Sequence, residues 1–183
     1  VTQGKRGVPE WLYTVKYMFT TSVVLTWLVF AVLLTPTVGV GYLVSSSNIL
    51  LHNVTPILAL LDFVLFDRAY APSRKRSLVA LVMPLAYALF FFAAYELSGR
   101  LPVPYFFLDY KTYGWLAIGP RGIGVVYWVL VISGVLVGMG VGILNLKEQC
   151  QKKPARCSVI VVAVMLGLSV VFALVGVLLH GIS

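Results

Sequence analysis

Residues 45–67 read SSSNILLHNVTPILALLDFVLFD, an apolar stretch interrupted by Asn48, His52, Thr55 and Asp62. An apolar run of about 20 residues is long enough to cross a hydrocarbon layer roughly 30 Å thick as a helix. At about 100° per residue the four polar side chains share an arc of about 80°, while Asn53 lies off it. Polar residues in a membrane span usually face a bundle interior or a cavity. The stretch therefore predicts a membrane-spanning helix with one polar face.

The composition extends this prediction to the whole chain. Of the 183 residues 60% are hydrophobic and 11% are charged, which leaves too little polar surface for a soluble domain. The short alternating segments of a transmembrane barrel are absent from the sequence. We expect an all-α, polytopic integral membrane bundle in which residues 1–183 form a single transmembrane domain. The five spans are predicted at about residues 10–35, 46–66, 78–97, 123–146 and 158–180.

The basic residues predict the orientation of this bundle. Ten of the 14 lysines and arginines lie in the N-terminal segment or in the basic loops 67–77 and 147–157, and three lie on the other side, in or beside the aromatic loop 98–122. Cytoplasmic loops carry such an excess. We expect a multi-pass protein of a bacterial inner membrane, with a cytoplasmic N-terminus and the C-terminus outside. The net charge of +8 is then a topology signal, and no nucleic-acid partner is expected.

His52 and Pro56 are the residues of the second span that point most clearly to a site. Pro56 has no amide to donate to the carbonyl of His52, so we expect a kink and a free carbonyl oxygen there. Asn48 and Thr55 would line the same outward-opening cavity. The alternative is that these polar residues only bond to neighbouring helices, as Asn and Thr often do in membranes.

Two carboxylates complete the predicted polar contacts. Asp109, in the aromatic loop, is expected to fold back and orient His52 as a general base, or else to be a solvated loop residue. Lys16 of the first span and Asp62 of the second lie at similar depth, and we expect a structural ion pair between them. Alternatively, Lys16 extends to the interface alone.

Glycine and cysteine patterns indicate structural roles. Gly134, Gly138 and Gly142 form a small-residue ridge that suits helix packing or a homodimer. Cys150 and Cys157 are expected to be reduced thiols, since disulfides are rare in the cytoplasm. The ligand spacing of a zinc site is absent from this sequence, and neither a metal nor another cofactor is expected.

SNILLHNVTPILALLDFVLF, followed by PVPYFFLDY, resembles the core of a family of small membrane proteins. Its animal members are the androgen-induced and androgen-regulated transmembrane threonine hydrolases, which cleave fatty acid esters of hydroxy fatty acids, and it has bacterial relatives. WLYTVKYMFTTSVVLTWLVF is similar to the helix before this core, so the resemblance covers about residues 11–146. It implies that His52 is the catalytic histidine and Asp109 the acidic loop residue, with a lipid or fatty-acyl ester as ligand.

The resemblance also implies a nucleophilic threonine on an earlier helix, and Thr20, Thr21 and Thr26 do not match that motif. Because the chain begins at Val1, we expect a preceding segment to hold the nucleophile and the whole protein to have six or seven spans. The leading hypothesis is a lipid-ester hydrolase in contact with membrane lipids. The alternatives are a small transporter or channel-like protein using Lys16, His52 and Asp62, and a structural membrane subunit.

Overall fold

Helices make up almost all of the described chain. The computed structural model describes residues 8–35, 38, 40–67, 74–98, 105–120 and 122–180. Five helical runs in this part are long and apolar enough to cross a membrane: Glu10–Leu34, Ser46–Phe66, Lys75–Ser98, Val125–Lys152 and Pro154–Leu178. Each overlaps a predicted span, so the predicted all-α, multi-pass architecture is confirmed.

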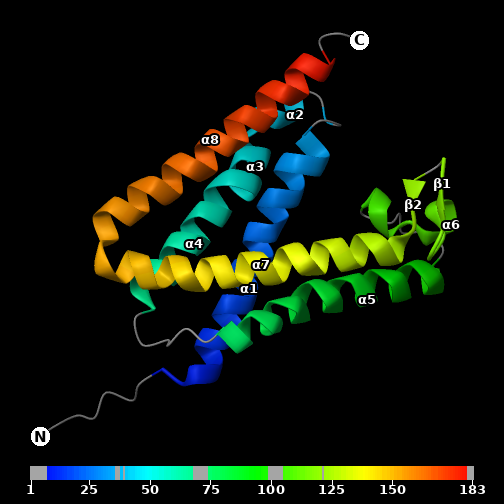
Figure 1. Ribbon diagram of the computed structural model, residues 1–183. Helices are drawn as coiled ribbons and strands as arrows, with labels where there is room; N and C mark the ends of the chain where they lie inside the picture. Colours follow the sequence, from blue (N-terminus) through cyan, green and yellow to red (C-terminus); the bar gives the residue numbers. More distant parts are fainter. Residues whose placement is uncertain are drawn as a thin grey trace, which may run out of the picture.

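Most of these runs are built from more than one element (Figure 1). The elements in chain order are α1 (Glu10–Val29), the π-helix η1 (Phe30–Leu34), α2 (Val40–Leu43), α3 (Ser46–Ile49), the π-helix η3 (Leu50–Val54), α4 (Thr55–Phe66), the 3₁₀-helix η4 (Arg74–Leu81), α5 (Val82–Ser98), the 3₁₀-helix η5 (Phe106–Leu108), α6 (Tyr110–Tyr113), β1 (Ile118–Gly119), β2 (Gly122–Ile123), α7 (Val125–Lys152) and α8 (Pro154–His180).

A single residue separates α7 from α8. Lys153 has φ −140° and ψ 70°, because Pro154 disfavours a helical conformation in the residue before it. The predicted basic loop 147–157 is therefore wrong: its first half belongs to α7 and its second half to α8. Most of the other predicted basic loop, 67–77, lies outside the described residues, and its last part is the start of η4.

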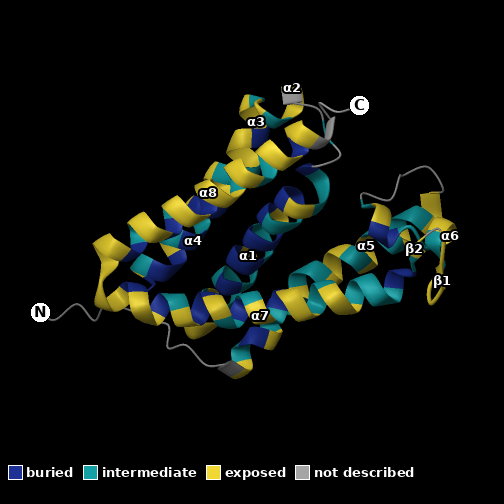
Figure 2. Ribbon diagram, turned by 45° about the horizontal axis from the view of Figure 1, so that its top comes forward, coloured by how far each residue is buried: buried dark blue, intermediate teal, exposed yellow. Residues whose placement is uncertain are grey.

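The core lies where α1, α4, η4 and α7 cross. Tyr17 and Phe63 are fully buried there, with ring centroids 5.6 Å apart. Gly140 of α7 permits this crossing, because a Cβ at that position would lie 2.4 Å from the Tyr17 hydroxyl and 3.6 Å from the Cβ of Ala80. The outward faces of α7 and α8 carry many exposed apolar side chains (Figure 2), as expected for surfaces that contact lipid.

The predicted glycine ridge does not pack inside the chain. A Cβ at Gly134, Gly138 or Gly142 would meet nothing within 4 Å among the described residues. The close approach occurs instead at Gly140, on another face of α7. The ridge is therefore left on the surface, and its proposed use in a homodimer stays a prediction.

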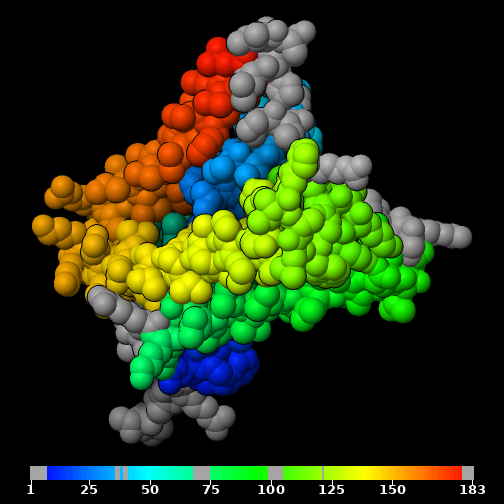
Figure 3. Space-filling view, turned by 45° about the vertical axis from the view of Figure 1, so that its right-hand side comes forward, coloured from blue at the N-terminus to red at the C-terminus, as the bar shows by residue number. Residues whose placement is uncertain are grey.

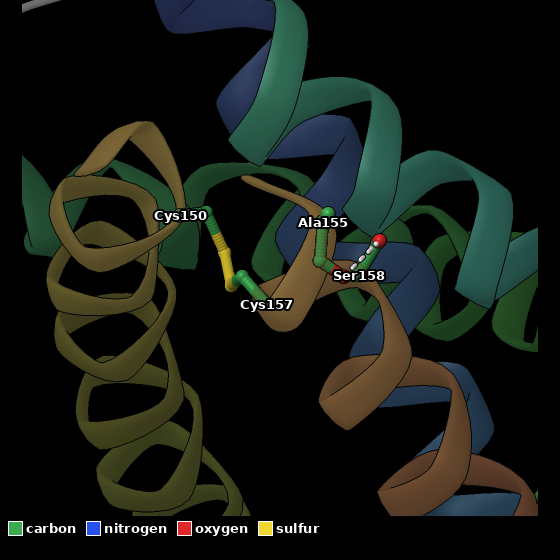
Figure 4. The surroundings of a disulfide bond; sticks show 4 residues. All are labelled: Cys150, Ala155, Cys157 and Ser158. Carbon is green, nitrogen blue, oxygen red and sulfur yellow. Dashed lines mark hydrogen bonds between the residues drawn. A yellow bond between two sulfur atoms is a disulfide. The ribbon is translucent and has the colours of Figure 1, made fainter. Parts of the chain in front are cut away.

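Cys150 and Cys157 form a disulfide across the α7–α8 turn (Figure 4), so the expectation of two reduced thiols is wrong for this structure. Their Cα atoms lie 5.1 Å apart, since the extended Lys153 folds the start of α8 back beside the last turns of α7. The side chain of Cys150 is fully buried and Cys157 is 9% exposed.

The end of α5 and the start of α7 carry a compact aromatic cap, formed by the described residues 105–120, 122 and 123. Phe107 and Leu108 of η5 are buried against Val125 at the start of α7. Behind them α6 and the β1–β2 hairpin, with Ile118 paired to Ile123, complete the cap, which Figure 3 shows over the ends of these helices. Gly114, at φ 73°, ends α6 in a conformation that glycine adopts without strain.

Candidate functional site

Two π-helical segments face each other near one end of the bundle. η1 closes the first span, and η3 precedes α4 in the second. Phe30 of η1 stacks on His52 of η3, with ring centroids 4.0 Å apart and an interplanar angle of 10°. π-helical turns are rare and are frequent at functional sites. This pairing therefore makes the surroundings of His52 the leading candidate for a site.

His52 and Asn48 line a small cavity between η1, η3 and α8, of about 50 Å³. Asn48 is 3% exposed, and its Nδ2 donates to the carbonyl oxygen of Leu43 at 2.9 Å. The Asn48 Oδ1 and the His52 Nδ1 are buried and have no hydrogen-bond partner among the described residues. Buried polar atoms are normally satisfied, so two such atoms in one cavity point to a bound molecule or water.

Two hydroxyl groups line the same cavity, those of Thr35 and Ser169. The Thr35 Oγ1 donates to the carbonyl oxygen of Phe30 at 3.1 Å, so its proton is engaged. The Ser169 Oγ accepts a hydrogen bond of 2.9 Å from the indole Nε1 of Trp27, which leaves the hydroxyl proton of Ser169 free to be donated.

α8 reaches this cavity because of a glycine. A Cβ at Gly176 would lie 2.9 Å from the carbonyl oxygen of Thr35, so only glycine lets α8 lie this close to the end of the first span. The predictions from sequence did not include Ser169 or Thr35. Ser169 is the only serine between residues 159 and 180 of this apolar helix, which was the available signal.

The predicted polar face of the second span needs correction. Thr55 is exposed and lines no part of the cavity; its Oγ1 donates to the carbonyl oxygen of Leu50 at 2.8 Å. Asn53, predicted to lie off the polar face, is among the lining residues. The reason is η3: a π-helical turn holds one residue more than an α-helical turn, and this rotates the rest of the helix by about 100°.

Pro56 is buried at the start of α4 and does not line the cavity. The predicted kink with a free His52 carbonyl assumed an α-helical hydrogen-bond pattern. In η3 the amide of Thr55 donates to the carbonyl oxygen of Leu50, five residues earlier. That bond involves neither Pro56 nor the carbonyl of His52, so the kink and the free oxygen stay predictions.

Asp109 does not reach His52. Its Oδ1 accepts a hydrogen bond of 3.1 Å from the backbone amide of Thr112, so the carboxylate caps α6. The predicted His52–Asp109 dyad is corrected accordingly, because Asp109 is not among the residues around the cavity. In Figures 1 and 2, α6 lies at the end of α5 and α7, well away from α3.

At the basic end of the bundle, four ionisable residues form a charge group: Lys16, Asp62, Asp67 and Lys147. The Lys16 Nζ lies 2.6 Å from the Asp62 Oδ2, which confirms the predicted ion pair, and 2.8 Å from the Asp67 Oδ2. The same group therefore joins the start of α1 to the end of α4 through two carboxylates rather than one.

Lys147 is fully buried, although the sequence placed it in a loop. Its Nζ donates to the carbonyl oxygens of Phe63 at 3.0 Å and Asp67 at 2.5 Å. Carbonyls at the end of a helix lack intrahelical partners, and a cation there also favours the helix dipole. Extending the predicted fourth span by one turn would have placed Lys147 on the buried face, four residues after Ile143.

Within the described ranges, three or more His, Cys, Asp or Glu side chains do not come together in a way that could hold a metal ion. Comparisons with protein-family models, with curated proteins and with solved structures found no match to this chain.

Proposed function

We propose that this protein is a membrane-embedded lipid-ester hydrolase that uses His52 as its base. One observation carries the proposal: His52, whose Nδ1 has no hydrogen-bond partner among the described residues, and Ser169 line a single cavity within membrane-spanning helices. An imidazole and a hydroxyl in one small cavity are the parts of an activated nucleophile. The resemblance of the residues around His52 to the transmembrane threonine hydrolases supports the same chemistry.

In the proposed reaction, the Ser169 oxygen attacks the ester carbonyl carbon while its proton moves to His52. The bond to the alcohol then breaks, and the alcohol leaves with that proton. A water molecule, deprotonated by His52, attacks the acyl-serine; the bond to the Ser169 oxygen breaks, this oxygen takes the proton back from His52, and the carboxylic acid is released. The hydrogen bond from Trp27 to the Ser169 oxygen would stabilise the charge that develops there.

The size of the cavity restricts how a substrate would be placed. A volume of about 50 Å³ admits an ester group but not the hydrocarbon on either side of it. The chains would therefore stay in the surrounding bilayer, and the substrate would enter laterally. We also propose a plasma-membrane location with the basic end in the cytoplasm, on the distribution of lysine and arginine.

Fluorophosphonate labelling of the full-length protein in membranes tests the proposal. The wild-type protein should take the label on Ser169, and His52→Ala should lower the labelling rate at least about a hundredfold. Ser169→Ala should abolish the adduct, whereas Ser158→Ala, which removes a hydroxyl at the basic end, should leave it unchanged.

An adduct on Thr35, or on a residue preceding Val1, would leave the hydrolase proposal standing but would assign the nucleophile to that residue instead of Ser169. A folded wild-type protein that takes no label would refute the proposal. The transport alternative has weaker support, because Lys16 and Asp62 belong to the charge group and neither lines the His52 cavity.

A further inference from the structure

A second and much larger chamber lies between α1, α5 and α7, with a volume of about 440 Å³. Along α1 it extends from Phe19 to Val29, about 15 Å at the helical rise of roughly 1.5 Å per residue. It shares no lining residue with the His52 cavity, and none of its own lining residues is charged. Its volume falls within the range of ligand pockets, about 300–1,000 Å³.

The chamber exists because the third span changes its helix type. The 3₁₀-helical part, η4, packs closely against α7, whereas α5 beyond it stands farther off. Pro84 follows the junction and lines the chamber. Because η4 leads directly into α5, Pro84 has no amide to donate to the preceding turn, which fits a change of helix type at this point.

Two polar residues of the wall on α1 turn their hydroxyl protons away from the chamber. The Ser22 Oγ donates to the carbonyl oxygen of Met18 at 2.8 Å, and the Thr26 Oγ1 donates to that of Ser22 at 3.0 Å. Both hydroxyl protons are thus turned back to α1. Ordered water needs about 2–4 polar partners, so a chamber of this kind favours an apolar occupant over water.

The end of the chamber beside the aromatic cap is closed, and its side between α1 and α5 is open. Phe107 and Leu108 of the aromatic cap line the closed end and are buried. At the same end, the rings of Tyr87 and Tyr105 lie beside each other, with centroids 6.5 Å apart. Phe19 and Leu85 also line the chamber, yet they are 50% and 40% exposed, so it communicates with the outside of the bundle, where a bilayer supplies hydrocarbon.

We infer that this chamber holds one acyl chain of a membrane phospholipid. Its uncharged lining and its open side suit a hydrocarbon chain that stays continuous with the bilayer. The chain enters between α1 and α5 from the bilayer and lies along α1 from Val29 toward Phe19. The site is separate from the His52 cavity, and the inference does not rest on hydrolase activity.

Two alanines of α5 provide a matched test. Ala88 lines the chamber, whereas Ala86, two residues earlier, is exposed and does not. Ala88→Trp should fill the chamber, and Ala86→Trp adds the same side chain outside it. The probe is a phosphatidylglycerol with a diazirine in its acyl chain, incorporated in nanodiscs with the full-length protein and cross-linked by light.

In the wild-type protein, adducts should map to residues 19–29 of α1 and 129–136 of α7. Ala88→Trp should lower their yield at least fivefold, and Ala86→Trp should leave it within twofold. If Ala88→Trp does not fold, Ser133→Phe inside the chamber and Val131→Phe on the exposed face of α7 form the second pair.

Three outcomes would overturn the inference. Adducts spread equally over exposed residues such as Leu130 and Val131, with no effect of either substitution, would indicate surface lipid alone. Adducts from a diazirine fatty acid but not from the phospholipid would show that the ligand is a free fatty acid and not a phospholipid. Cross-links between two copies of the chain through the chamber would show that a second protein molecule occupies it.

Discussion

Replacing Gly140 with alanine should destabilise the protein, although alanine is the better helix former. The added Cβ would lie 2.4 Å from the Tyr17 hydroxyl, about 1 Å inside an ordinary contact. Tyr17 cannot move away easily, because its side chain is fully buried and packs on Phe63. Adding a methyl group to such a core costs about 1–3 kcal/mol.

Gly138→Ala is the matched control on the same helix. A Cβ at Gly138 meets nothing within 4 Å among the described residues. Both substitutions gain about 1 kcal/mol of helix propensity, so this gain cancels when the two variants are compared. The remaining difference is the overpacking at Gly140, about 1–3 kcal/mol, which corresponds to roughly 2–12 °C in Tm.

The assay is thermal unfolding of the full-length protein in detergent, followed by intrinsic tryptophan fluorescence. Gly140→Ala should melt below Gly138→Ala, and the double variant Gly140→Ala/Tyr17→Phe should recover part of the loss relative to Tyr17→Phe alone. Gly167→Ala on α8 is a second control, because a Cβ there also meets nothing within 4 Å. A lower Tm for Gly138→Ala than for Gly167→Ala would indicate that Gly138 contacts a second molecule. Equal Tm values for Gly140→Ala and Gly138→Ala, or no recovery in the double variant, would refute the close crossing of α1 and α7 at Gly140.

Two additional outcomes are expected at the basic end of the bundle. Asp62→Asn should lower stability by no more than about 1 kcal/mol, because the Asp62 side chain is 55% exposed and Lys16 keeps Asp67 as a partner. Asp67→Asn should cost more, about 1.5–3 kcal/mol, since the side chain that pairs with Lys16 is only 11% exposed; equal losses in a detergent melt would contradict this ranking. In protein purified without a reductant and then denatured, a maleimide-polyethylene glycol reagent should label Cys150 and Cys157 only if the protein is reduced first. Labelling without reduction would restore the expectation of free thiols.

Some features of the site were predictable from local chemistry. Lys16 and Asp62 pair as expected, because both lie on long apolar helices where depth depends directly on residue number. His52 lies beside a cavity for the same reason: an ionisable residue in a span is costly unless it faces the interior. The position of each of these residues along its helix was sufficient for the prediction, without knowledge of how the helices cross.

Predictions that depended on helix rotation or on distant segments were wrong. Thr55 lies outside the cavity and Asn53 lines it, because the π-helical turn η3 rotates the later part of the helix, and sequence periodicity assumes a regular helix. Asp109 caps α6 instead of meeting His52, since the divergence of the long helices carries the aromatic cap away.

The sequence by itself determined the class of protein, the number of spans and the end of the bundle that is basic. These depend on composition and on the length of apolar runs, which are local properties. Only the tertiary structure decided that Gly140 and not the Gly134 ridge is the point of close packing, that Ser169 of α8 joins His52, and that an apolar chamber opens beside α1. Those features arise where helices far apart in the sequence cross, and crossing angles are set by the fit of many side chains together.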